Sequence, residues 1–320
     1  MAAAGEEGLA IETQSEVIGA RAGSFFMRPV EVVAAILLVV IVGLLLAGVF
    51  TRYVLHMPVV WIDEAASISF LWLAMLGSAI AVDRNEHLRL TVFLNLFPLR
   101  WRGLIETLAT MIAITALATL LLPAVEYVRE ESYVTSAALK IPVSYRVSAI
   151  VVGIVLMLAV ALGHLARTAA KQEIATAAAI IAALGLACWL LSPLFLGFGY
   201  LNILIFLVGV AALCLVLGVP IAFCFAMGTI GFLAFTTHVP MIVMIGRMDE
   251  GMSSLILLSV PIFVLLGCIL DATGMGKAIV DFMASLLGHV KAGMSYVLLG
   301  SLFLVSGISG SKVSDMATVA

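Results

Sequence analysis

The chain has 320 residues, of which 64% are hydrophobic and only 11% charged, and its mean hydropathy is +1.25. Soluble domains carry about 45–50% apolar and about 25% charged residues, so this composition excludes an ordinary soluble protein. The formal net charge of −3 gives no reason to expect nucleic acid as a partner.

Long apolar runs recur along the chain and predict an all-α, multi-pass membrane protein. About 20 apolar residues in a helix cross a hydrocarbon core of about 30 Å. The short alternating segments of a membrane barrel do not occur in this sequence. The predicted apolar helices cover residues 30–50, 65–82, 104–125, 143–164, 174–196, 201–217, 220–236, 253–270 and 292–305.

The distribution of Lys and Arg predicts a cytoplasmic N-terminus. With that orientation, the segments around the first four spans place eight positive residues on the cytoplasmic side and four outside. Residues 1–29 then form a polar cytoplasmic tail, and residues 30–170 form a four-helix membrane block. Residues 171–198 add one crossing, which inverts the next block, residues 199–320, relative to the first.

The second block contains two features that interrupt its apolar runs. Pro220, in "LGVPIAF", predicts a kink or a tight turn between two helices, because proline removes a backbone donor and clashes with the preceding turn. Residues 236–254 predict an outer loop with an amphipathic portion. Residues 271–293 predict a helix that lies along the cytoplasmic interface.

The last 18 residues, "FLVSGISGSKVSDMATVA", place a glycine- and serine-rich cluster after a short apolar run. A run of about 15 residues at about 1.5 Å per residue does not complete a crossing, so we expect this cluster near the middle of the bilayer. Glycines permit a re-entrant hairpin there, serine hydroxyls and free carbonyls supply oxygen ligands for a cation, and half-helix N-termini supply donors for an anion. The cluster contains Ser306, Gly307, Ser309, Gly310 and Ser311, and it is followed by Lys312 and Asp315, ionisable residues that are costly at membrane depth and usually functional there. Close helix packing through small residues is the alternative interpretation.

A second polar cluster opens the second predicted helix. Asp63 and Glu64 stand at its outer start, where carboxylates suit the positive end of the helix dipole, and Arg52 is one loop away and able to pair with them. We interpret these three residues as structural. Because no metal-ligand spacing and no convergent catalytic groups occur in the sequence, we predict no enzyme and no cofactor.

Several of these segments resemble, in order, the membrane subunits of tripartite ATP-independent periplasmic (TRAP) transporters. "RYVLHMPVVWIDEAASISFLWLAMLGSAIAVDRNEHLRL" and "LKIPVSYRVSAIVVGIVLM" resemble the small subunit. "LGVPIAF", "SVPIFVLLGCILDATGMGKAIVDFMASLLGHVKAGMSYV" and "SGISGSKVSDMA" resemble the beginning of the large subunit. The likeness fits a fusion of small and large subunits through a linker helix, with the large subunit incomplete.

The resemblance implies a permease of the bacterial inner membrane that imports organic acid anions, of the dicarboxylate or sugar-acid type, by sodium symport. It also implies a separate periplasmic substrate-binding protein as partner, and an elevator mechanism in which hairpin tips enclose substrate and sodium. On this basis Ser306 to Ser311 match the first hairpin tip, with Asp315 in support. Lys312 departs from the small residue that many members have after "SGS", so we expect this cation to alter the site or to contact a substrate carboxylate. Two alternatives stay open: another ion-coupled anion transporter, and a membrane assembly subunit that does not transport.

Overall fold

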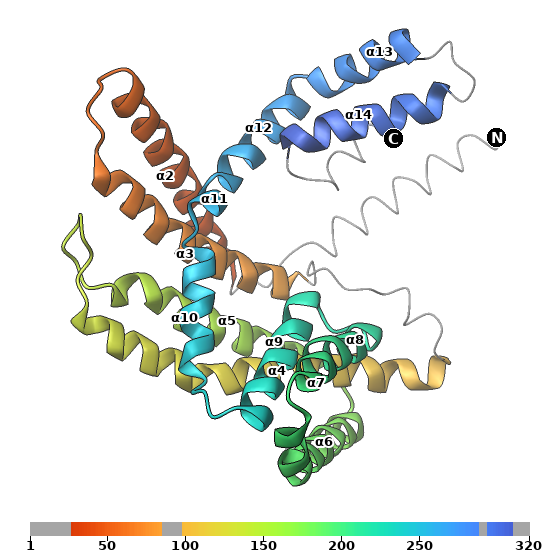
Figure 1. Ribbon diagram of the computed structural model, residues 1–320. Coiled ribbons are helices and arrows are strands. Elements are labelled where there is room, and N and C mark those ends of the chain that lie inside the picture. The colour runs from red at the N-terminus through yellow and green to blue at the C-terminus, as the bar shows by residue number, and fades with distance from the viewer. Residues whose placement is uncertain (1–26, 85–97, 288–292, 310–320) are drawn as a thin grey trace. The chain divides into compact units, whose positions relative to one another are not determined.

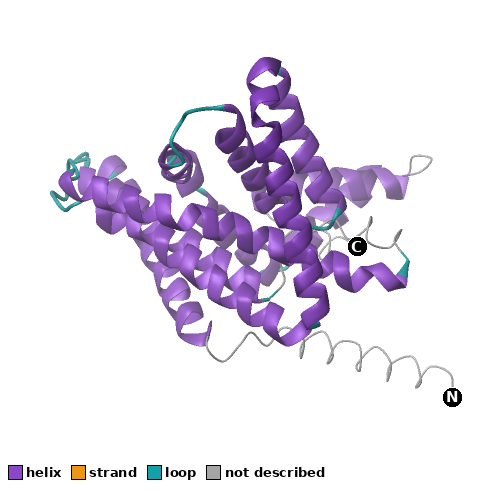
Figure 2. Ribbon diagram, turned by 90° about the horizontal axis from the view of Figure 1, so that it is seen from below, coloured by secondary structure: helices purple, strands orange, loops and turns teal. Residues whose placement is uncertain are grey.

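A computed structural model describes residues 27–84, 98–287 and 293–309 of the chain (Figure 1). Helices account for nearly all of these residues, and no strand occurs among them beyond one isolated bridge between Thr135 and Pro142 (Figure 2). The expected all-helical fold is therefore confirmed. The helices are α2 (Arg28–Tyr53), α3 (Val60–Asp83), α4 (Leu99–Glu130), η3 (Glu131–Tyr133), α5 (Ser144–Thr168), α6 (Lys171–Phe198), α7 (Leu201–Ile203), η4 (Leu204–Val210), α8 (Ala211–Val216), α9 (Ile221–Thr236), α10 (Ile242–Met252), α11 (Leu255–Leu258), α12 (Val260–Ala272), α13 (Met275–Leu287) and α14 (Gly293–Ser309).

Five of the described helices are long and apolar enough to cross a membrane, and their positions agree with the first five predicted spans. They cover Arg28–Tyr53, Val60–Asp83, Trp101–Tyr133, Ser144–Thr168 and Lys171–Phe195. A sixth span results if α10 and the apolar helix after it are counted as one broken crossing. The protein is therefore a multi-pass membrane protein.

The apolar helix α2 carries a charged residue in its first turn and another in its last turn. Glu31 lies in its first turn and Arg52 in its last, where each charge opposes the helix dipole. The Glu31 carboxylate accepts a hydrogen bond at 2.5 Å from Nη2 of Arg84, the residue that directly follows α3. This ion pair connects the first turn of α2 with the residue that follows α3.

The chain divides into two compact units, residues 1–37 with 71–251 and residues 38–70 with 252–320. In the first unit α4 packs against α5 and α6, and α9 packs against η4, α8, α4 and α6 (Figure 1). Its core is made of aliphatic and small side chains; on α5 they are Val147, Ala149, Ile150, Gly153, Ile154, Met157, Ala161 and Leu165. In the second unit α14 packs against α12 and α13.

Three segments of the second block differ in detail from their prediction. The predicted span 201–217 is helical throughout but contains η4, a seven-residue π-helix. The predicted span 253–270 is divided into α11 and α12, and the division falls just before Pro261. Proline has no backbone N–H to donate into a preceding turn, which accounts for the break. Much of the predicted outer loop after Thr236 is the helix α10.

Candidate functional site

The predicted hairpin site lies only partly within the described residues. The last turn of α14, which ends at Ser309, contains Ser306, Gly307 and Ser309. Gly310, Ser311, Lys312 and Asp315 lie outside the described residues. The binding role of these seven residues therefore stays a prediction.

The preceding turns of α14 show how this helix is held in its unit. A Cβ added at Gly300 would overlap Met283 Cε of α13, so the end of the Met283 side chain lies directly over Gly300. Val297 and Ser301, on the same side of α14, are buried. The Ser301 hydroxyl has no hydrogen-bond partner among the described residues. A buried hydroxyl without a partner is costly, so α14 carries a polar group one turn before the predicted tip that an additional contact would stabilise.

The opposite side of α14 is apolar and open. Leu299 is 67% exposed and Phe303 81% exposed. With Leu287, Tyr296 and Gly300 these residues line a cavity of about 570 Å³. Such a surface suits contact with lipid or with further membrane helices rather than with a polar ligand.

Arg52, Asp63 and Glu64 occupy the positions predicted for a structural cluster. Arg52 Nη2 lies 3.1 Å from Asp63 Oδ2, which confirms the expected pairing between the end of α2 and the start of α3. The two side chains are 53% and 46% exposed, so this ion pair contributes little to stability. Glu64 also has an interaction partner.

Pro220 lies in a tight turn between α8 and α9, which decides between the two interpretations of this residue. Gly218 has a φ of +78°, a conformation that glycine adopts without strain. The Gly218 and Val219 N–H groups donate to the carbonyls of Leu215 and Cys214. These bonds end α8, and Pro220 then begins α9 with its φ fixed at −56°.

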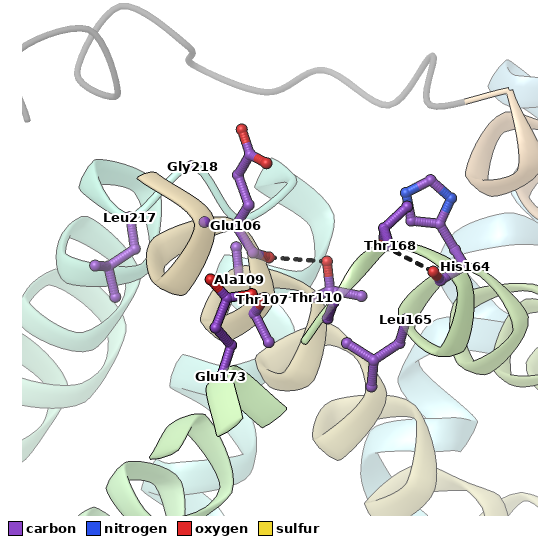
Figure 3. Close-up of a pocket in the computed structure, with 12 residues that line it drawn as sticks. Glu106, Thr107, Ala109, Thr110, His164, Leu165, Thr168, Glu173, Leu217 and Gly218 are labelled. Atoms are coloured by element: carbon purple, nitrogen blue, oxygen red, sulfur yellow. Dashed lines mark hydrogen bonds between the residues drawn. The ribbon is translucent and has the colours of Figure 1, made fainter. Parts of the chain in front are cut away.

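A polar hollow lies beside this turn, where α4, α5 and α6 meet (Figure 3). Its volume is about 240 Å³, and its polar lining groups are Glu106, Thr107, Thr110, His164, Thr168 and Glu173. The Thr110 and Thr168 hydroxyls donate to carbonyls four residues earlier, in their own helices. Glu173 accepts from the Ala170 N–H at 3.3 Å, so its carboxylate completes the first turn of α6. Among the described residues no group of three or more His, Cys, Asp or Glu is placed to hold a metal ion.

The sequence prediction missed a buried charged cluster at the other end of α4 and α5. Asp249 of α10 is 3% exposed. Its carboxylate accepts hydrogen bonds from Arg146 Nη2 at 2.6 Å and from the Tyr127 hydroxyl at 3.4 Å. A signal for it does exist in the sequence, because Asp249 falls four residues after the buried Ile245, on the same face of an amphipathic helix.

Comparison with known proteins gives two matches in chain order. A family model described as tripartite ATP-independent periplasmic transporters, DctQ component, matches residues 26–171. A second, described as tripartite ATP-independent periplasmic transporter, DctM component, matches residues 208–320. Helix α6 lies between the two matches.

Similar curated proteins are transporter permeases. The sialic acid TRAP transporter permease protein SiaT of Haemophilus influenzae is 26% identical over 297 residues, which cover 87% of this chain and 47% of that protein. The isethionate TRAP transporter permease protein DctMQ of Oleidesulfovibrio alaskensis is 25% identical over 264 residues, 81% of this chain and 41% of that protein. The 2,3-diketo-L-gulonate TRAP transporter large permease protein YiaN of Escherichia coli K12 is 34% identical over 104 residues, 32% of this chain and 24% of that protein. The chain thus spans less than half the length of these relatives.

Proposed function

Because the chain belongs to the TRAP transporter permeases, with a small-subunit part joined to part of a large subunit, we propose that it serves sodium-coupled import of organic acid anions. The observation that carries this proposal is the order of the two family matches, with a membrane-spanning helix between them. The proposal concerns a permease of the relatives' full length that contains this chain.

The names of the relatives support small organic acids as the substrate class. Sialic acid, isethionate and diketogulonate are anions of this kind that differ in size and in the acid group. We expect a separate periplasmic binding protein to deliver the substrate, in keeping with the tripartite architecture for which the family is named. Selectivity is then divided between that protein and the permease.

The proposed sodium and substrate site is the last turn of α14 together with the tip that follows it. The last carbonyls of a helix have no partners within the helix, and together with the hydroxyls of Ser306, Ser309 and Ser311 they would offer hard oxygen ligands to sodium. Gly307 in the last turn of α14 and Gly310 directly after this helix would let the helix end and the backbone reverse, and Asp315 would balance the cation. Lys312 would contact the acid group of the substrate. We propose that this tip moves with an elevator-type transport module.

The proposed topology follows from the charge distribution and the helix lengths. Residues 1–29 form a cytoplasmic tail, residues 30–170 the small-subunit-like block, residues 171–198 the linker and residues 199–320 the large-subunit-like part. The N-terminus lies in the cytoplasm, and the protein resides in the bacterial inner membrane.

Uptake into proteoliposomes tests the proposed function. The permease of full length is reconstituted and supplied with radiolabelled sialic acid or isethionate, with and without its periplasmic binding protein, under an inward sodium gradient or an equal potassium gradient. We expect uptake only with both sodium and the binding protein. Undiminished uptake in the absence of both would contradict the proposal.

A further inference from the structure

The cluster around Asp249 joins the two family-matched parts of the chain. Tyr127 and Arg146 belong to the part that matches the small subunit, whereas Asp249 belongs to the part that matches the large subunit. Arg146 Nη2 lies 2.6 Å from Asp249 Oδ2, and the two side chains are 27% and 5% exposed. The ion pair is therefore largely shielded from solvent on the carboxylate side.

The residues next to Arg146 and Asp249 are apolar and buried. Val147, next to Arg146, and Ile245, one turn before Asp249, are both fully buried. The Tyr127 ring lies within 3.6 Å of the Cβ position of Gly246 on α10. The start of α5 is fixed by Trp72, whose Nε1 donates to the Tyr145 carbonyl at 3.1 Å. Arg146 thus reaches Asp249 from a backbone that is itself anchored.

The energetics of such a pair favour a role in specificity. Removing a carboxylate and a guanidinium from water is costly, and their attraction offsets that cost only when both partners are present in good geometry. The buried Arg146 Nε has no hydrogen-bond partner among the described residues, so the pair is not optimised for stability alone. Loss of either partner leaves a buried charge uncompensated, which strongly disfavours any other register of the helices.

The covalent connection between the two parts does not fix their register. Only 6% of the most apolar window of α6 is buried, so most of this linker helix faces outward. Helix α9, which packs against α4, is apolar along most of its length, and apolar contacts carry little directional information. A directional contact is therefore needed to fix α10 on α4 and α5.

We propose that Arg146 and Asp249, with the Tyr127 hydroxyl, form a charge lock that positions α10 of the large-subunit-like part on the small-subunit-like helices. The lock works independently of the linker helix and of sodium. It goes beyond the proposed transport function and is tested without measuring transport.

The test cuts the linker of the folded protein and measures whether the two parts stay together. A protease site is inserted between Ala169 and Ala170, in the loop after α5, and the purified full chain is cleaved in detergent. The C-terminal fragment is held on a resin, and the apparent dissociation constant of the N-terminal fragment is obtained by dilution. We expect Arg146→Ala and Asp249→Ala each to weaken association about 100-fold or more, because each leaves a buried charge unpaired.

The charge-swapped double variant, Arg146→Asp with Asp249→Arg, is expected to bind within about tenfold of the parent. Arg247 and Glu250 supply a matched control, since they form an exposed ion pair in the same helix, with exposed fractions of 76% and 70%. Arg247→Ala and Glu250→Ala should leave association unchanged. If a single variant does not fold, the dissociation constant of the charge-swapped double variant alone tests the proposal. The proposal would be overturned if the single variants had the dissociation constant of the parent, or if the charge-swapped double variant did not recover it.

Discussion

Gly153 of α5 lies directly against Met75 of α3. A Cβ built at Gly153 would stand 2.5 Å from Met75 Cε and 2.8 Å from Met75 Cβ. Both residues belong to the first compact unit, and Met75 is only 4% exposed. Small residues at such a crossing let two membrane helices approach closely, so the absence of a side chain at position 153 is what permits this contact.

Replacing Gly153 with alanine is expected to lower stability. The added methyl group would overlap Met75 Cβ, which cannot move without the α3 backbone, and overpacking of this kind costs about 1–3 kcal/mol. The measurement is thermal unfolding of the purified protein in detergent. Gly163→Ala is the matched control, because position 163 is in the same helix and faces open space. That variant should be neutral or gain up to about 1 kcal/mol from alanine's higher helix propensity. Equal unfolding temperatures for the two variants would show that the Gly153 contact is not close-packed.

The contact between α9 and the π-helix η4 gives a second prediction. A Cβ at Gly228 would lie 2.8 Å from the Phe206 carbonyl oxygen, and one at Gly231 would lie 2.8 Å from Phe206 Cδ1. We expect Gly228→Ala to lower the free energy of unfolding by about 1–3 kcal/mol, since a backbone oxygen cannot move aside as a side chain can. Gly185→Ala in α6, where nothing lies within 4 Å, is the control. A Gly228→Ala protein as stable as that control in thermal unfolding would contradict the close approach.

The helices of the first block were predictable from sequence because length and hydropathy alone determine them. The predicted run 143–164 corresponds to α5, Ser144–Thr168, and the run 30–50 to α2, Arg28–Tyr53. In a bilayer each backbone group must be satisfied within its segment, so an apolar run of this length has only the helix available to it. An interruption at Pro220 was predictable because proline has no backbone N–H and clashes with the preceding helical turn. The choice between a kink and a tight turn required the conformation of Gly218.

The pairing of Arg146 with Asp249 could not be predicted in the same way, because 103 residues separate the two partners. The segment "RMDEG" contains three charged residues, and local sequence gives each of them the same polar character. Only packing distinguishes them: Arg247 and Glu250 are exposed, whereas Asp249 is buried against α4 and α5. Helical periodicity with Ile245 was the available clue, and it identifies the buried face but not the partner.

The exposed pair between Arg52 and Asp63 is expected to contribute little to stability. Because both side chains are about half exposed, Asp63→Asn should change the free energy of unfolding by no more than about 1 kcal/mol. Glu31→Gln serves as the comparison, because its ion pair with Arg84 is less exposed, at 29% and 33% of the side chains. Thermal unfolding at low and high salt measures both. A loss for Asp63→Asn larger than that for Glu31→Gln would contradict this ranking.

Serine substitutions at the tip after α14 test the proposed sodium site. In the permease of full length, Ser309→Ala or Ser311→Ala removes one hydroxyl oxygen that we expect to face sodium. Each variant should raise the sodium concentration needed for half-maximal uptake by about tenfold, the effect of one lost hydrogen bond or ligand of about 1.4 kcal/mol, with expression unchanged.

The control for these variants is Ser285→Ala in α13. The Ser285 hydroxyl donates to the Phe282 carbonyl at 2.7 Å within its own helix and lies outside the predicted tip. Sodium activation of this variant should therefore match that of the parent. If Ser309→Ala and Ser311→Ala also show the parent's sodium dependence, neither hydroxyl is a sodium ligand, and the serines at the tip serve helix packing instead.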